Sequence, residues 1–172
     1  MSLKGKRIAI LTEDMYEELE LWYPYYRLVE EGAEVKIIGP EAKEYQSKHG
    51  YPVQAEFAAG KVKADDFDGV VVPGGFAPDR LRRYSAVLNL IRGVFKKGGA
   101  VASICHGVWV LISAGIMKGK RATCVSAIKD DLINAGATYL DQEVVVDGNL
   151  VTSRTPQDLP SFLPAIISTF KK

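Results

Sequence analysis

The stretch from Ala100 to Gly107 reads AVASICHG. Its first five residues are all apolar or small, which is typical of a strand that is buried on both faces. Cys105 and His106 follow directly, and the next residues, GVWVLISAG, have the composition of a helix. Catalytic groups and ligands gather at the carboxyl ends of the strands in a parallel sheet. The stretch therefore predicts a buried parallel strand that ends in a candidate site.

Three further segments resemble this buried strand, and helical patterns separate them. A helical segment that ends at Gly32 lies between the first two, and an amphipathic helix is predicted from Ser85 to Lys97. Apolar strands that alternate with helices indicate a parallel sheet covered on both faces, which places the chain in the α/β class. The three segments are Arg7–Leu11 (RIAIL), Val35–Ile38 (VKII) and Gly69–Val72 (GVVV).

Other local signals predict the remaining elements. The segment YPVQAEF, residues 51–57, alternates as a hairpin or edge segment does, and EVVVDGNLVTS predicts a tight hairpin at its Asp-Gly-Asn turn. A closing helix is expected from Pro156 to Phe170, after a Thr-Pro start signal. Pro24 suggests that a regular helix starts or kinks there.

The composition limits the classes of function. With 172 residues, 47% of them hydrophobic, the chain is expected to form one domain over residues 1–172. Its net charge of +1 gives no reason to expect nucleic acid or a membrane as a partner. No apolar run has the length of a membrane span or a signal peptide, so a cytoplasmic protein is expected. The spacing of Cys and His fits no metal site, and no nucleotide fingerprint occurs, so neither metal nor cofactor is predicted.

Cys105 has the surroundings of a nucleophile at a strand-to-helix turn. Ser103 and Gly107 place small residues two positions before and after it, as the Gly-x-Ser-x-Gly elbow requires. Because a helix N-terminus favours thiolate over thiol, a lowered pKa is expected for Cys105. The alternative is a buried structural cysteine, which packs like a small hydrophobe. Cys124, which has no acid, His or Gly turn beside it, is predicted to be a core residue.

The partners of the thiol are less certain from local sequence. The two histidines of the chain are His106, which is either a base or only a polar residue at a helix start, and His49, which is expected in a surface turn. The first strand-to-helix connection carries several glutamates, and an apolar setting around Glu20 favours its protonated form. The other glutamates of this segment fit solvated first-turn acids better, and these are Glu13, Glu17 and Glu18.

A second strand ends in Pro73-Gly74-Gly75, within VVVPGGFAPDR. These glycines allow a backbone N–H to point at a substrate oxygen, and the N–H of His106 would supply a second donor. Together they predict an oxyanion hole. The alternative is that the two glycines are needed only for the positive φ angles of a turn.

These motifs together resemble the PfpI-type intracellular cysteine peptidases of the glutamine-amidotransferase-like superfamily, which also contains the Parkinsonism-associated deglycase. The similarity runs in order through YEELELWYPYYRLVEEGAEV, KHGY, DGVVVPGG, VASICHG, LISAG, IKDDLINAGA and EVVVDGNLVTSR. It implies a flavodoxin-like three-layer α/β sandwich with a mainly parallel sheet. It also implies that Cys105 is the nucleophile, His106 its base, and the N–H groups of Gly75 and His106 the oxyanion hole. Glu20 matches the glutamate that hydrogen-bonds the thiol, and Glu17 matches a second acid at the mouth of the site.

Two positions depart from the pattern of the peptidases. In those enzymes a glutamate from a neighbouring subunit completes a Cys-His-acid triad, and here that position is Asp79, which is one methylene shorter. A Pro that follows the CHG motif in the peptidases is replaced by Val108, and the bulky Trp109 comes next. The resemblance implies a homodimer, often assembled further into hexamers, in which Asp79 is contributed across a subunit interface.

Three functions are compatible with this sequence. The first is a cysteine hydrolase of the PfpI type that cleaves peptides through an acyl-enzyme. The second is a glyoxalase or deglycase in which the same cysteine adds to methylglyoxal or its protein adducts, and Glu20 or Glu17 moves protons. The third is a non-catalytic stress sensor whose Cys105 is oxidised to a sulfinate stabilised by Glu20. The expected substrate is a peptide or a small carbonyl compound.

Overall fold

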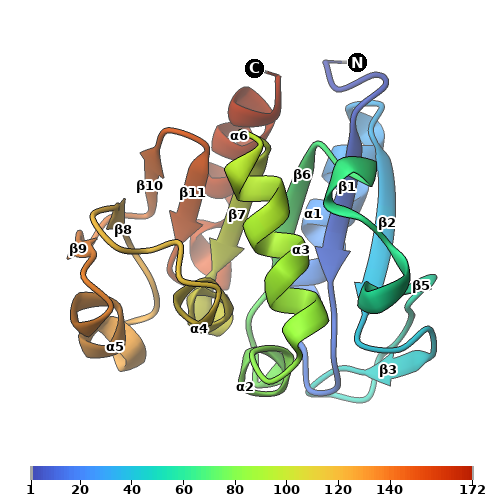
Figure 1. Ribbon diagram of the computed structural model, residues 1–172, viewed down its shortest axis with the longest axis horizontal. Helices are drawn as coiled ribbons and strands as arrows, with labels where there is room; N and C mark the ends of the chain where they lie inside the picture. The colour runs from blue at the N-terminus through green and yellow to red at the C-terminus, as the bar shows by residue number, and fades with distance from the viewer. Residues whose placement is uncertain (1, 172) are drawn as a thin grey trace.

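The computed structural model describes residues 2–171, and a seven-stranded sheet forms its centre (Figure 1). The strand order is β10-β11-β7-β6-β1-β2-β5, and every neighbouring pair is parallel except the hairpin of β10 and β11. The strands are β1 (Arg7–Leu11), β2 (Glu34–Gly39), β5 (Phe57–Ala58), β6 (Gly69–Val72), β7 (Ala100–Ile104), β10 (Val144–Asp147) and β11 (Leu150–Ser153). The mainly parallel sheet predicted from the buried apolar runs is confirmed, and the predicted bounds of β1, β6 and β7 agree with the structure.

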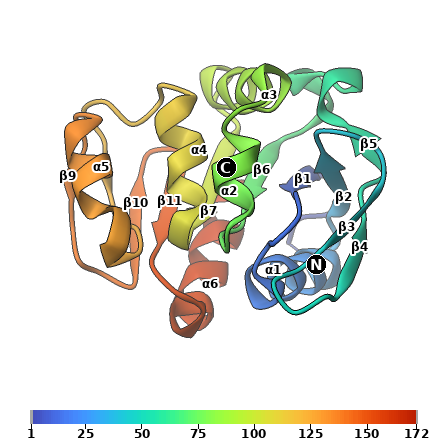
Figure 2. The ribbon, with the colours of Figure 1, turned by 90° about the horizontal axis from the view of Figure 1, so that it is seen from below.

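Helices cover both faces of the sheet, as Figure 2 shows, with α1 and α6 on one face and α3 on the other. The α-helices are α1 (Glu18–Glu30), α2 (Ala77–Leu81), α3 (Ser85–Lys96), α4 (Val108–Ser113), α5 (Lys129–Asn134) and α6 (Leu159–Phe170). The apolar face of α3, with Val87, Leu90, Ile91 and Val94, is buried, because amphipathic spacing directs these side chains toward the strands. The predicted three-layer sandwich is therefore the observed architecture.

Short elements fill the connections. Strands β3 (Glu44–Gln46) and β4 (Pro52–Gln54) pair antiparallel, and β8 (Arg121–Ala122) pairs parallel with β9 (Thr138–Tyr139). The 3₁₀ turns are η1 (Ala59–Lys61), η2 (Ala64–Asp66), η3 (Cys105–Gly107), η4 (Ser126–Ile128) and η5 (Pro156–Asp158). Within the described chain, no helix is long and apolar enough to cross a bilayer.

Most local expectations agree with these elements. The segment at residues 51–57 supplies β4 of a hairpin and the edge strand β5, and Asp147 pairs with Leu150 across the predicted tight turn. The closing helix forms as η5 followed by α6. The expectation that a helix starts at Pro24 is wrong as to the start: α1 begins at Glu18, and Pro24 lies buried inside it. A proline in a helix removes one backbone hydrogen bond, and here the burial of Leu21 and Leu28 on the same helix offsets that loss.

The topology places three strand ends side by side. Strand β6 lies between β1 and β7, with Val71 opposite Ile10 on one side and Ala102 on the other. Because the three strands are parallel, their carboxyl ends lead into the loops after β1, β6 and β7 at one edge of the sheet. Glu13, Glu17 and the Gly-Gly turn lie on these connections, Glu18 and Glu20 lie in the first turn of α1, and Cys105 directly follows β7.

Candidate active site

Cys105 occupies a strained elbow where β7 ends and η3 begins. Its φ angle is 60°, in the left-handed region that residues other than glycine rarely adopt. The neighbouring Gly107 has no room for a side chain, because a Cβ there would lie 2.4 Å from the carbonyl oxygen of Val72 and 2.6 Å from Oγ of Ser103. The expected requirement for a small residue after the cysteine is therefore confirmed at Gly107.

Two backbone donors converge on the sulfur of Cys105. The backbone N–H groups of Gly75 and His106 face it and lower the pKa of the thiol, because they favour the thiolate form. Gly75 has a φ of 78°, and a Cβ there would lie 2.5 Å from the carbonyl oxygen of Met15 and 2.6 Å from the amide nitrogen of Glu17. Only glycine fits this position. The two donors predicted for an oxyanion hole thus lie together at the thiol.

Glu20 is buried next to the thiol. It projects from the first turn of α1, its exposed fraction is 0%, and its Oε2 accepts a 2.7 Å hydrogen bond from the N–H of Gly74. A Cβ on Gly74 would lie 2.5 Å from that oxygen and 2.7 Å from Cβ of Cys105, so the two side chains flank this glycine. Burial raises the pKa of Glu20 to about 8, which keeps the carboxyl protonated at neutral pH. Its Oε1 has no hydrogen-bond partner within residues 2–171.

The thiol of Cys105 does not have the lowered pKa that the helix N-terminus suggested. Burial first, and the carboxylate charge of Glu20 second, raise the pKa of Cys105 to about 12. The following helix, α4, has only six residues, and Cys105 lies before it at the start of η3, so a helix-terminus effect is small here. Below the pKa of Glu20 the carboxyl is neutral, and its repulsion of the thiolate is absent.

His106 lies half-buried beside the thiol. Its Nδ1 is 3.3 Å from Sγ of Cys105, so the two adjacent side chains do meet. Burial, and then the charge of Lys48, lower the pKa of His106. The imidazole is therefore neutral at pH 7 and able to accept a proton.

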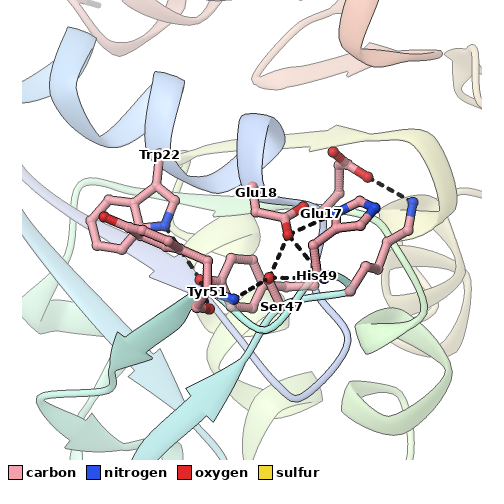
Figure 3. A network of polar contacts seen from close by, with 8 residues as sticks. Glu17, Glu18, Trp22, Ser47, His49 and Tyr51 are labelled. Carbon is pink, nitrogen blue, oxygen red and sulfur yellow. Dashed lines mark hydrogen bonds and ion pairs between the residues drawn. The ribbon is translucent and has the colours of Figure 1, made fainter.

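Glu17 stands at the N-terminus of α1 and forms an ion pair with Lys48, at 2.8 Å between Oε2 and Nζ (Figure 3). The N–H of Lys48 donates to the carbonyl oxygen of Tyr16, and Tyr16 forms a β-bridge with Gly75, which connects the backbone of this lysine to the Gly-Gly turn. Lys48 begins the KHGY segment, but the sequence does not reveal its ion pair, because Glu17 lies 31 residues earlier in the chain. It adds a positive charge at the site.

The remaining glutamates of this segment are not solvated. Glu13 is 5% exposed, and its Oε1 accepts a 2.9 Å hydrogen bond from the N–H of Asp14, so the expectation of a solvated acid is wrong for it. The carboxylate of Glu18 accepts hydrogen bonds from the hydroxyl of Ser47 and the backbone N–H of His49, and its Oε1 lies 2.9 Å from Nδ1 of His49 (Figure 3). These contacts hold the loop after β3 against α1.

Asp79 and Cys124 are the other two positions for which the sequence makes a prediction. The side chain of Asp79, in α2, is 50% exposed and forms an ion pair with Arg83. Within the described chain it makes no hydrogen bond with His106, and its contribution across a subunit interface stays a prediction. Cys124 is fully buried, as expected for a core residue. No cluster of three or more His, Cys, Asp or Glu side chains suited to a metal ion is found in residues 2–171.

Comparisons with known proteins show which proteins this chain is similar to. The sequence profile of the DJ-1/PfpI family matches residues 6–169. The Deglycase PfpI of Pyrococcus furiosus is 44% identical over 165 residues, which cover 96% of this chain and 99% of that protein. The Putative cysteine protease YraA of Bacillus subtilis is 44% identical over 159 residues, 92% of this chain and 94% of that one. The crystal structure of Drosophila melanogaster DJ-1beta superposes with a TM-score of 0.90 at 29% identity, over 96% of this chain and 90% of that chain.

Proposed function

Since this chain belongs to the DJ-1/PfpI family, we propose that it is a cysteine-dependent enzyme that releases methylglyoxal from its adducts with amines as lactate. One observation supports this reaction most: Cys105 lies beside Glu20, a buried carboxyl whose raised pKa keeps it protonated at neutral pH, and two backbone N–H groups face the thiol. A carboxyl whose pKa is about 8 is protonated at neutral pH and close enough to it to give up and regain a proton during isomerisation of a carbonyl compound. The names of several relatives, among them Deglycase PfpI, favour the same activity.

The first step exchanges an amine for the thiol. The adduct is a hemiaminal, in which the amine nitrogen is bonded to C1 of methylglyoxal. Sγ of Cys105 bonds to C1 while the C–N bond breaks, and the thiol proton passes through His106 to the leaving amine. His106 is placed for this transfer by its 3.3 Å contact with the sulfur. The product on the enzyme is a hemithioacetal.

The second step isomerises the hemithioacetal to a thioester. Neutral His106 removes the hydrogen of C1 as a proton, and protonated Glu20 donates to the oxygen on C2, which gives an enediol. His106 then returns its proton to C2, and Glu20 takes the proton of the C1 hydroxyl. Both residues end as they began. Water hydrolyses the thioester to lactate and the free thiol, and the N–H groups of Gly75 and His106 stabilise the oxyanion of this step.

Peptide cleavage, the activity placed first from the sequence, is a second proposal. The family resemblance and the name of the relative YraA favour it. A hollow of about 450 Å³ lies beside Glu18, where it would accept an apolar side chain, and it is lined by Glu18, Leu19, Trp22, Tyr26, His49 and Tyr51. For this reaction His106 needs an orienting acid, and we propose that Asp79 of the partner subunit in a homodimer supplies it.

The two proposals are separated by parallel assays on one preparation. Lactate released from a methylglyoxal-treated amine and cleavage of an unfolded peptide are measured for the wild type and for Cys105→Ser, His106→Ala, Glu20→Gln and Asp79→Ala. Cys124→Ala serves as the matched control, because it removes the other thiol of the chain. Deglycation is expected to fall at least about a hundredfold in Cys105→Ser and to remain in Asp79→Ala.

The outcomes distinguish the activities. Loss of peptide cleavage but not of lactate release in Asp79→Ala supports the triad across subunits. If the wild type releases no more lactate than Cys105→Ser, deglycation is excluded. Equal rates for the wild type and Cys105→Ser on every substrate would contradict both enzymatic proposals.

A further inference from the structure

Trp109 packs against the imidazole of His106. The two ring centroids are 5.2 Å apart, and the ring planes meet at 64°, which is the edge-to-face arrangement of an aromatic pair. Trp109 is the second residue of α4, and it follows His106 by three positions, which brings both side chains to one side of the turn. The sequence identified this tryptophan as a departure from the peptidases, and the proposed reaction assigns it no role.

The indole of Trp109 is held by two other helices. Its Nε1–H donates a 2.8 Å hydrogen bond to Oδ2 of Asp131 on α5. The guanidinium carbon of Arg82, at the end of α2, lies 5.4 Å from the centre of the indole, within the range of a cation–π interaction. Arg82 is itself fixed, since its Nε–H donates a 2.9 Å hydrogen bond to Oγ of Ser113. The tryptophan is therefore anchored on both an edge and a face.

His106 lacks comparable polar support. Within residues 2–171 its imidazole has one polar contact, the 3.3 Å approach of Nδ1 to Sγ of Cys105, and no carboxylate is hydrogen-bonded to it. An imidazole with a single polar contact is free to rotate about its Cβ–Cγ bond unless packing prevents this. The side chain that packs edge-on against it is Trp109.

We propose that Trp109, anchored by Asp131 and Arg82, is a positioning residue that holds Nδ1 of His106 toward the sulfur of Cys105. In a catalytic triad a hydrogen-bonded acid orients the imidazole. Here the anchored indole would restrict the rotation of the imidazole instead. The inference rests on the proposed function in one respect, because it takes His106 as the group that moves the proton of the thiol.

The test uses a residue that acts on His106 only through the tryptophan. Asp131→Ala removes the acceptor of the indole N–H, and Trp109→Phe keeps an aromatic ring without that N–H. Asp130→Ala is the matched control: Asp130 is the neighbouring exposed aspartate of α5, and its side chain makes no hydrogen bond in the described chain. The proteins are compared as full chains by thermal unfolding, lactate release, the pH profile of Cys105 alkylation by iodoacetamide, and the NMR resonances of their two histidines.

In Asp131→Ala and Trp109→Phe, kcat is expected to fall about tenfold with KM nearly unchanged, because the proton-transfer geometry loosens while substrate contacts remain. The alkylation profile and the His106 resonances are expected to change in both variants, while those of His49 stay constant. In the double variant the losses should not add, since both changes break one connection. Asp130→Ala should match the wild type in every measurement.

Folded Asp131→Ala and Trp109→Phe proteins that match Asp130→Ala in alkylation profile and His106 resonances would overturn the inference. Alkylation and NMR need no substrate, so they report on His106 even if the wild type releases no lactate. In that case the proposed deglycation fails, and the alkylation and NMR measurements still show whether Trp109 positions His106.

Discussion

Replacing Glu20 by Gln is expected to stabilise the protein at neutral and alkaline pH. Glu20 is fully buried, and its pKa rises from an ordinary 4.5 to about 8. Between these two values the unfolded chain has an ionised Glu20 and the folded chain keeps the proton. Folding therefore takes up a proton in this range, and stability falls as pH rises. Gln cannot ionise, and its amide oxygen can still accept the hydrogen bond from the N–H of Gly74.

The magnitude follows from the width of this range. Each unit of pKa difference corresponds to about 1.4 kcal/mol, so at pH 7 the carboxyl lowers the free energy of unfolding by about 3 kcal/mol. The penalty is absent below pH 4.5, grows as pH rises, and becomes constant above a pH of about 8. For a chain of this size, about 3 kcal/mol corresponds to a change in Tm on the order of 10 °C.

Thermal unfolding measured from pH 4 to pH 9 checks this prediction. The Tm of Glu20→Gln should equal that of the wild type near pH 4.5 and exceed it increasingly up to about pH 8. Glu41→Gln is the control, because the side chain of Glu41 is 72% exposed, and its Tm difference from the wild type should not grow in this way. A difference for Glu20→Gln that is constant across the range, or of opposite sign, would refute the buried and protonated carboxyl.

Three other changes have definite expected results. Gly74→Ala should abolish lactate release and lower Tm, because its Cβ would lie 2.7 Å from Cβ of Cys105; turnover and calorimetry measure this. Lys48→Met should raise the pKa of His106, because the charge of Lys48 lowers it. This pKa is measured by NMR titration of the imidazole, and a lower or unchanged value would contradict the effect of Lys48. Mild peroxide should oxidise Cys105 before the fully buried Cys124, as read by mass spectrometry, and the reverse order would exclude the sensor hypothesis.

The fold was predictable because the central strands are buried on both faces. Strands β1, β6 and β7 show this as unbroken apolar runs, and their predicted bounds agree with the structure. The start of α1 was not predictable from Pro24, because the helix is stabilised by the burial of its apolar side chains against the rest of the fold. Local sequence signals capture propensity, while packing decides such cases.

The proximity of the candidate site residues was predictable from the sequence, and their pKa values were less so. Cys105, Gly75 and Glu20 follow from their places at strand ends and in an apolar segment, and the structure brings them together. The adjacent helix alone predicts a lowered pKa for Cys105. Burial and the charge of Glu20, which lies 85 positions away, have the larger effect. The ion pair of Lys48 has no sequence signal, since it depends on how a later loop folds back onto α1.

The identity of the covalent intermediate tests the central claim most directly. The wild type is mixed with methylglyoxal, quenched in acid during turnover, digested and analysed by mass spectrometry with and without hydroxylamine treatment. A lactoyl thioester on the peptide that contains Cys105, removed by hydroxylamine and absent from Cys105→Ser, is the predicted result. Turnover with adducts on arginine or lysine side chains alone, or on Cys124, would contradict the account.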